Sequence, residues 1–83
     1  MDSNTTLYSV DEFDKALVEA ILIEVFLSLK EKGYDPINQM VGYLMSGDPG
    51  YISSYKDARK KIVSIDRSRI LEFLLRKGLG EEI

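Results

Sequence analysis

The chain has 83 residues, a formal net charge of −3, and neither cysteine nor histidine. This length allows one domain near the lower limit of what buries a sufficient core alone. The two missing residue types exclude disulfides, ordinary zinc or iron–sulfur sites, and Ser-His-Asp or Cys-His catalysis. We therefore expect a non-enzymatic protein without metal or cofactor, stabilised by tight packing and by association of two copies.

The charge is unevenly distributed. Residues 1–54 carry three lysines against nine acids, whereas residues 55–77 carry eight lysines and arginines against three acids. A basic C-terminal half is compatible with nucleic acid or another anionic partner. Because these charges alternate with apolar residues and the whole chain is acidic, solvated helix faces are the preferred interpretation.

Residues 1–9 are polar, and we expect them to form a flexible tail ahead of one domain at 10–83. Ser9 and Glu12 match a capping box, with Asp11 as a competing cap, so a helix is predicted to begin near residue 11. No basic region precedes an apolar run as in a secretory signal, so a cytoplasmic location is expected.

The first predicted helix is apolar almost all round between Leu17 and Leu29. Such a helix is buried on more than one side, and a chain this small cannot wrap it completely. The run is too short to span a membrane, and its glutamates are badly placed for one. We therefore expect a homodimer whose interface includes four of its residues: Leu22, Val25, Phe26 and Leu29.

The next stretch, residues 33–51, reads GYDPINQMVGYLMSGDPGY. Asp35-Pro36 is typical of an N-cap followed by a first helical position, and Gly47 of a helix end, which predicts a helix over 36–46. Asp48-Pro49-Gly50 then predicts a turn. Gly42 lies inside the helix, so we expect another segment to pack closely there, with the first helix as the candidate.

Two further helices are predicted in the basic region. Ser54 to Asp57 is a weak cap for a third helix, and Asp66 caps a fourth that ends at Gly78. The inward residues are expected to be Tyr55, Ala58, Ile62 and Ile65 in the third helix, and Ile70, Leu71, Leu74 and Leu75 in the fourth. The predicted fold is therefore all-α, with about four helices in an intertwined or closely packed homodimer.

The central stretch and the residues after it closely resemble the IreB family of small regulatory phosphoproteins of Gram-positive bacteria. The shared residues are Glu31-Lys32-Gly33-Tyr34, Pro36-Ile37-Asn38-Gln39, Val41-Gly42-Tyr43, Ser46-Gly47-Asp48-Pro49, Tyr51-Ile52 and Asp57-Ala58-Arg59. The resemblance implies a role downstream of a membrane Ser/Thr kinase with PASTA domains, opposed by a phosphatase. That system acts in cell-envelope stress and cephalosporin resistance, and the downstream protein bound is unknown.

The resemblance also implies phosphorylation of N-terminal threonines. Thr5 and Thr6 are the candidates, and Thr5 is the better match by position, while the family's other threonine falls near Asp2 or Ser3. From residue types alone, a polar tail is the simpler interpretation. The chain also departs from the family at Ser53-Ser54, where relatives usually have proline and a basic residue.

A second set of candidates surrounds the central helix. Exposed amides and phenols combine contact area with hydrogen bonding, which suits protein recognition. The alternative, equally favoured, is that the tyrosines pack over the corner while the amides cap turns. The candidate partner-binding residues are Tyr34, Asn38, Gln39, Tyr43, Asp48 and Tyr51.

The remaining alternative is a small nucleic-acid-binding adaptor. The helix at 36–46, the following turn and the basic helix superficially resemble a helix-turn-helix unit, with residues 56–69 as the binding surface. The connection is longer than usual and the chain is acidic, and both features argue against nucleic acid as a partner. An enzyme ranks third, because Glu24 and Glu31 would pair only across a dimer.

Overall fold

The computed structural model describes residues 10–81, with side chains from residue 14 onward. Its helices are α1 (Val10–Lys32), α2 (Pro36–Ser46), α3 (Ala58–Val63) and α4 (Arg67–Gly78), with short 3-10 turns η1 (Pro49–Tyr51) and η2 (Tyr55–Asp57). No strand occurs in this part of the chain. The prediction of an all-α fold with about four helices is confirmed, while Ser9 and the tail at 1–9 lie outside the described residues.

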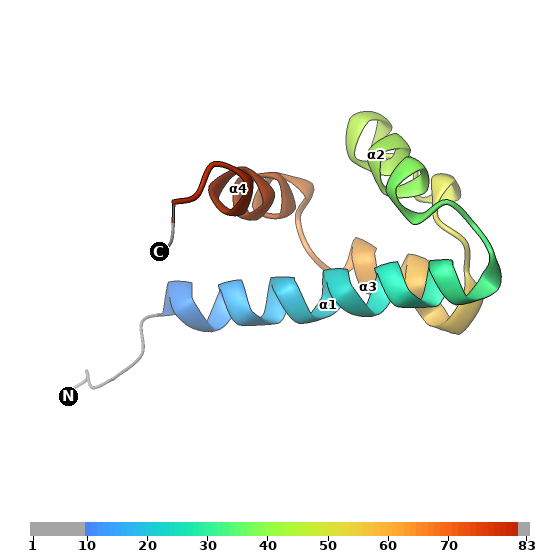
Figure 1. Cartoon of the computed structure of the whole chain (residues 1–83), viewed down its shortest axis with the longest axis horizontal. Helices are drawn as coiled ribbons and strands as arrows, with labels where there is room; N and C mark the ends of the chain where they lie inside the picture. Colours follow the sequence, from blue (N-terminus) through green and yellow to red (C-terminus); the bar gives the residue numbers. More distant parts are fainter. Residues whose placement is uncertain (1–9, 82–83) are drawn as a thin grey trace.

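Helix α1 is the element against which the others pack. Figure 1 shows α2 and α4 on one side of this 23-residue helix, with α3 alongside its second half. One stripe of α1 side chains is buried by them: Val18, Leu22, Val25 and Leu29. Their spacing of three and four residues places them on a single face, as an α-helix requires.

The burial of this stripe within one chain differs from the dimer interface that the sequence led us to expect. Leu22, Val25 and Leu29 are at most 7% exposed within one chain, so they belong to its own core. Phe26 alone of the four interface candidates stays partly exposed. The sequence pattern identified the apolar residues correctly, but it did not show that α2, α3 and α4 of the same chain cover that face.

The remaining core residues come from every other helix and the connections between them. They are Tyr43, Ile52, Ala58, Ile62, Ile65 and Ile70, with Met40, Leu44 and Phe73 packed against them. The inward placement predicted for Ala58, Ile62 and Ile65 is confirmed.

Helix α2 has the ends that its sequence predicts. The side chain of Asp35 accepts a hydrogen bond of 3.1 Å from the backbone N–H of Asn38, and Pro36 opens the helix. At the other end Gly47 takes φ +77°, and its N–H donates to the carbonyl of Tyr43. Local chemistry alone therefore sets the bounds of this helix.

Gly42 is close to another segment, as expected, but that segment is η1 rather than α1. A Cβ added at Gly42 would lie 2.4 Å from Cδ1 of Tyr51. The absence of a side chain at Gly42 lets the Tyr51 ring lie directly on α2.

The chain enters α3 differently from the prediction. Ser54 makes no side-chain cap bond, and Lys56 and Asp57 take φ of +51° and +63°. Two consecutive left-handed residues other than glycine are uncommon. They delay the start of α3 to Ala58.

Helix α4 turns a different face inward from the one predicted. Ile70 is fully buried and Phe73 is half-buried, whereas Leu71, Leu74 and Leu75 are 42–61% exposed. The expectation for these three leucines was wrong, because only the edge of α4 that carries Ile70 and Phe73 meets the core. The helix does end at Gly78, but the left-handed glycine that closes it is Gly80.

In the described part of the chain, no helix combines the length and apolar character needed to cross a membrane.

Candidate functional site

The central corner, where α2, η1, η2 and α3 meet, contains most of the residues proposed for partner binding. An open hollow of about 370 Å³ lies on its outer side. It is lined by Pro49, Ser54, Asp57, Arg59, Lys60 and Val63. We call this hollow, with the six residues that line it, the corner hollow.

The six partner-binding candidates do not form one patch. Tyr34 precedes α2 and Asp48 follows it, so they flank opposite ends of an 11-residue helix about 16 Å long. Tyr43 is only 5% exposed and belongs to the core, so its ring is not available to a partner in this structure.

The polar candidates also have structural partners. The side-chain oxygen of Gln39 accepts a 3.2 Å hydrogen bond from the N–H of Ser53, which ties α2 to the segment after η1. Asp48 accepts a 2.9 Å bond from the N–H of Gly50 and so caps η1. Tyr34 and Tyr51 stay 42% and 51% exposed, so they are the phenols that this surface presents.

A polar cluster fixes the corner to the end of α1. The carboxylate of Glu31 accepts hydrogen bonds from Lys56 Nζ at 2.9 Å and from the Tyr55 hydroxyl at 3.1 Å. These bonds, that to Lys56 first, lower the pKa of Glu31, and the same contact raises the pKa of Lys56. The ammonium group of Lys32 also lies 5.1 Å from the centre of the Tyr55 ring. The cluster therefore holds the left-handed Lys56 against α1.

Two arginines that were not among the predicted site residues bind backbone carbonyls. Arg59 Nε donates to the carbonyl of Ile52 at 2.8 Å, and Arg67 Nη1 donates to that of Leu44 at 3.0 Å. The motif residues Asp57-Ala58-Arg59 gave a signal for the first, whereas no local pattern indicated the second.

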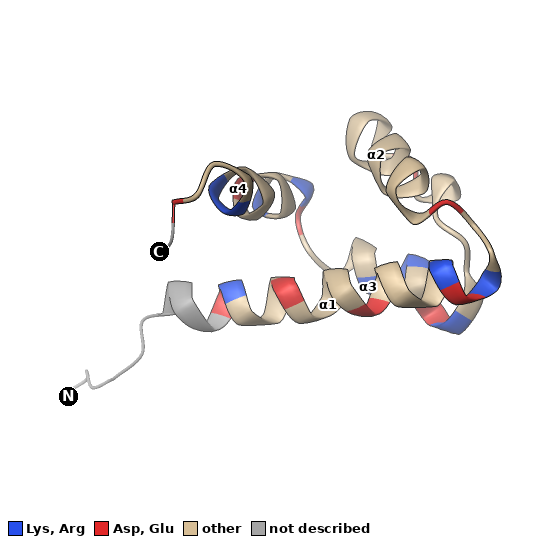
Figure 2. Ribbon diagram, viewed as in Figure 1, with Lys and Arg blue, Asp and Glu red and all other residues tan. Residues whose placement is uncertain are grey.

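Most cations proposed for nucleic-acid binding are engaged within the chain. Besides Arg59 and Arg67, Lys56 pairs with Glu31, Lys61 with Glu24 at 3.5 Å, and Arg69 with Asp14. Figure 2 shows basic and acidic residues interspersed along α1, next to α3, whose charged residues are all basic. Five of the six cations between residues 56 and 69 thus have partners, and Asp57 and Asp66 lie in the same region, so it lacks the continuous basic footprint of a nucleic-acid-binding surface.

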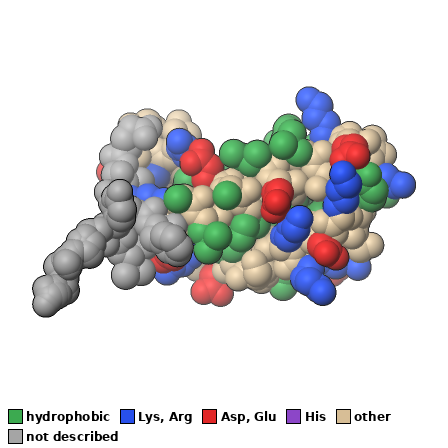
Figure 3. All heavy atoms as spheres, turned by 90° about the horizontal axis from the view of Figure 1, so that it is seen from below, with side chains coloured by type: hydrophobic (Ala, Val, Ile, Leu, Met, Phe, Trp, Pro, Cys, Tyr) green, Lys and Arg blue, Asp and Glu red, His purple; other side chains and the backbone are tan. Residues whose placement is uncertain are grey.

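The exposed apolar side chains are more distinctive than the charges. Helix α2 carries no charged residue (Figure 2), and Ile37, Val41 and Met45 lie exposed on it at four-residue spacing. Hydrophobic side chains are also exposed on the face seen in Figure 3. In all, thirteen large apolar side chains of the described residues are at least 42% exposed. Exposed apolar side chains grouped on one side of a helix, as Ile37, Val41 and Met45 are on α2, are typical of a surface that binds another protein.

Within the described residues, no three acidic side chains lie together as a group that could hold a metal ion. The exposed side chains of the corner offer apolar contact and hydrogen bonding. Thr5 and Thr6 lie outside the described residues.

Comparison with protein families agrees with the resemblance seen in the sequence. The pattern of the IreB regulatory phosphoprotein family matches residues 3–80. The match spans all four helices and the corner between α2 and α3. Membership supports a regulatory role. The chain therefore belongs to the IreB family of regulatory phosphoproteins.

Proposed function

We propose that this protein is a non-enzymatic regulatory phosphoprotein that acts in the cytoplasm by binding other proteins. It acts downstream of a PASTA-type Ser/Thr kinase and its opposing phosphatase, in cell-envelope stress and cephalosporin resistance. The observation that carries the proposal is the family match over residues 3–80. The exposed apolar surface supports protein binding as the mode of action.

The protein acts as a homodimer, with an interface different from the one that the sequence indicated. Because Leu22, Val25 and Leu29 serve the chain's own core, the interface uses the apolar side chains that remain exposed. We assign it to α2 and α4, which lie on the same side of α1 (Figure 1). The interface residues are Ile37, Val41 and Met45 of α2, Leu71 and Leu75 of α4, and Leu79 directly after α4. A stable dimer buries about 1,200–2,000 Å² in total.

Thr5 or Thr6 is the phosphoacceptor. Incubation with the cognate kinase followed by mass spectrometry is expected to place phosphate on one of them, and the double variant Thr5→Ala, Thr6→Ala should take up none. Phosphate confined to Ser53, Ser54 or Ser64 would contradict the proposal.

The downstream protein makes two separate contacts, with the exposed Tyr34 just before α2 and with the corner hollow. Affinity capture with phosphorylated and unphosphorylated protein should retain a protein in only one of the two states. Tyr34→Ala and Lys60→Ala should weaken that retention, because both side chains are exposed at the corner. Ser68→Ala, an exposed change on α4, is the matched control. Equal retention by all of these proteins would refute the assignment to the corner.

A further inference from the structure

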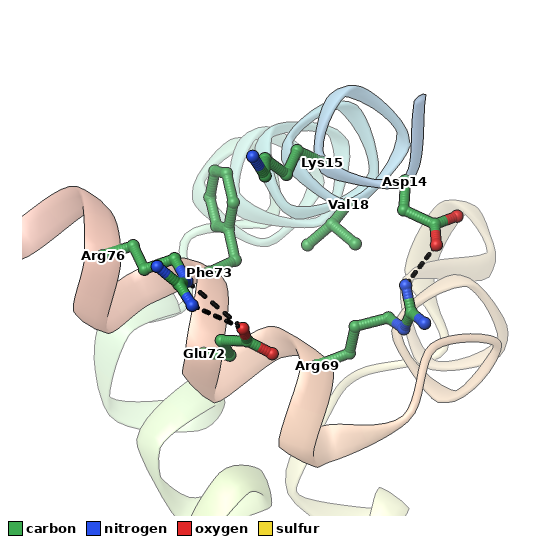
Figure 4. A pocket seen from close by; sticks show the side chains of 7 residues that line it. All are labelled: Asp14, Lys15, Val18, Arg69, Glu72, Phe73 and Arg76. Carbon is green, nitrogen blue, oxygen red and sulfur yellow. Dashed lines mark hydrogen bonds and ion pairs between the residues drawn. The ribbon is translucent and has the colours of Figure 1, made fainter. Parts of the chain in front are cut away.

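A cavity between the first turns of α1 and helix α4 brings three cations together. It has a volume of about 120 Å³ and lies far along α1 from the corner. Lys15 comes from α1, and Arg69 and Arg76 come from α4, where they lie about two turns apart. Figure 4 shows the two arginines at opposite ends of the cavity, with Phe73 and Val18 between them.

Both arginines are held by carboxylates in half-exposed positions. Arg69 pairs with Asp14, and their side chains are 49% and 30% exposed. Arg76 pairs with Glu72 at 3.1 Å and with Glu81. Ion pairs with this much solvent access contribute little stability. A stronger anion can therefore exchange with these carboxylates at low cost.

The candidate phosphoacceptors are within reach of this cavity. Thr6 precedes Val10, the first residue of α1, by four positions, so the intervening chain spans at most about 13 Å. Asp14 lies four residues into α1, about 6 Å along the helix. A phosphate on Thr5 or Thr6 can thus meet Arg69 when the chain folds back along the first turn.

We propose that the phosphothreonine of this chain's own N-terminal segment docks in the cavity, where its phosphate takes the Arg69 guanidinium from Asp14. Lys15 and Arg76 add positive charge around it. This inference rests on the proposed function, because it presumes phosphate on Thr5 or Thr6. Phosphorylation then exchanges an α1–α4 ion pair for a tether between the tail and α4.

The charge of the phosphate and the geometry of arginine–phosphate binding decide whether the phosphate displaces Asp14 from Arg69. A phosphothreonine carries about −1.5 to −2 charges at neutral pH, and arginine binds phosphate through two parallel hydrogen bonds. Asp14 and Glu72 oppose docking by repulsion. The short linker offsets that repulsion, because it holds the phosphate at an effective concentration of about millimolar.

Phosphorus NMR on protein synthesised with phosphothreonine at position 5 or at position 6 tests the proposal. Contact with arginine favours the dianion and lowers the second pKa of the phosphate. In one of the two proteins we expect that pKa to fall below that of the free phosphopeptide of residues 1–9, by about 0.5 to 1. Arg69→Gln should return it to the peptide value, whereas Asp14→Asn should lower it further by removing the competing carboxylate.

Lys77→Gln is the matched control. Lys77 also lies on α4 and pairs across to α1, with Glu19 at 3.6 Å, but it does not line the cavity. It should leave the phosphate pKa unchanged. Intrachain docking would be overturned if Lys77→Gln changed the phosphate pKa as much as Arg69→Gln does. It would also be overturned if the phosphate pKa equalled that of the free peptide in both proteins, or if the shift depended on protein concentration.

Synthetic installation of the phosphate separates this inference from the proposed function. If kinase treatment fails to modify Thr5 or Thr6, the proposed function fails, although the NMR titration can still detect docking. If the kinase modifies the tail and the titration finds no contact with Arg69, only the docking fails.

Discussion

The contact between Gly42 and Tyr51 gives the sharpest test of the central corner. A Cβ built on Gly42 lies 2.4 Å from Cδ1 and 2.8 Å from Cε1 of the Tyr51 ring. These atoms belong to a rigid ring close to its attachment point, so Gly42→Ala requires the whole ring to move. Helix propensity acts in the opposite direction, since alanine favours a helix interior over glycine by about 1 kcal/mol.

The two effects can be compared in size. Tyr51 is 51% exposed, so about half of its side chain is buried. A fully buried aromatic side chain removes about 150–250 Å² from water, and half of that, at about 25 cal/mol per Å², is worth about 2–3 kcal/mol. Losing most of this contact outweighs the propensity gain. We expect Gly42→Ala to lower the free energy of unfolding by about 1–2 kcal/mol, and the melting temperature by several degrees.

Thermal melts of four proteins, at one protein concentration, measure both effects: wild type, Gly42→Ala, Tyr51→Ala and the double variant. In the Tyr51→Ala background the clash is gone, so Gly42→Ala should raise the free energy of unfolding by about 1 kcal/mol. The effect of Gly42→Ala on the free energy of unfolding thus changes sign with the residue at position 51. A higher midpoint for Gly42→Ala in the wild-type background would refute the close packing of Tyr51.

Met45→Glu places a charge on an 82% exposed side chain of the proposed interface, and light scattering should find a folded monomer; an unchanged dimer mass would contradict that interface. Gly47→Val should lower the urea midpoint more than Gly47→Ala, because φ +77° penalises any Cβ and a larger side chain displaces the Arg67 guanidinium further. The hydrogen bond from Lys56 lowers the pKa of Glu31 from its ordinary value of 4.5. This bond therefore stabilises the folded protein at pH values above 4.5, and the stabilisation is lost as the pH falls through the lowered pKa. Glu31→Gln should therefore flatten the acid side of the stability curve, and identical curves for both proteins would refute this.

The bounds of α2 were predictable because short-range chemistry sets them. Asp35, Pro36 and Gly47 each act on backbone groups within four residues, so the sequence contains the whole interaction. The same holds for the cap that Asp48 places on η1.

The orientation of the helices was not predictable, because it depends on contacts distant in sequence. Leu71 and Ile70 are neighbours of similar hydropathy, yet only Ile70 is buried, since the direction in which α4 crosses α1 decides it. The apolar pattern of α1 likewise did not show whether a partner chain or helices α2 and α3 of the same chain cover its apolar face. Arg67 has no local pattern at all, because its acceptor, the carbonyl of Leu44, is 23 residues away.

Different helices cover the two halves of α1, and this has a consequence for local unfolding. Its second half is covered by α3, whose removal would expose Ala58 and Ile62 together with Val25 and Leu29, all fully buried. Its first half is covered by α4, which contributes Ile70, half-buried Phe73 and solvent-exposed ion pairs. Detaching α4 therefore exposes less apolar surface than opening the corner does. Amide hydrogens in α4 and the first turns of α1 should exchange with solvent through an opening of lower free energy than those in α3.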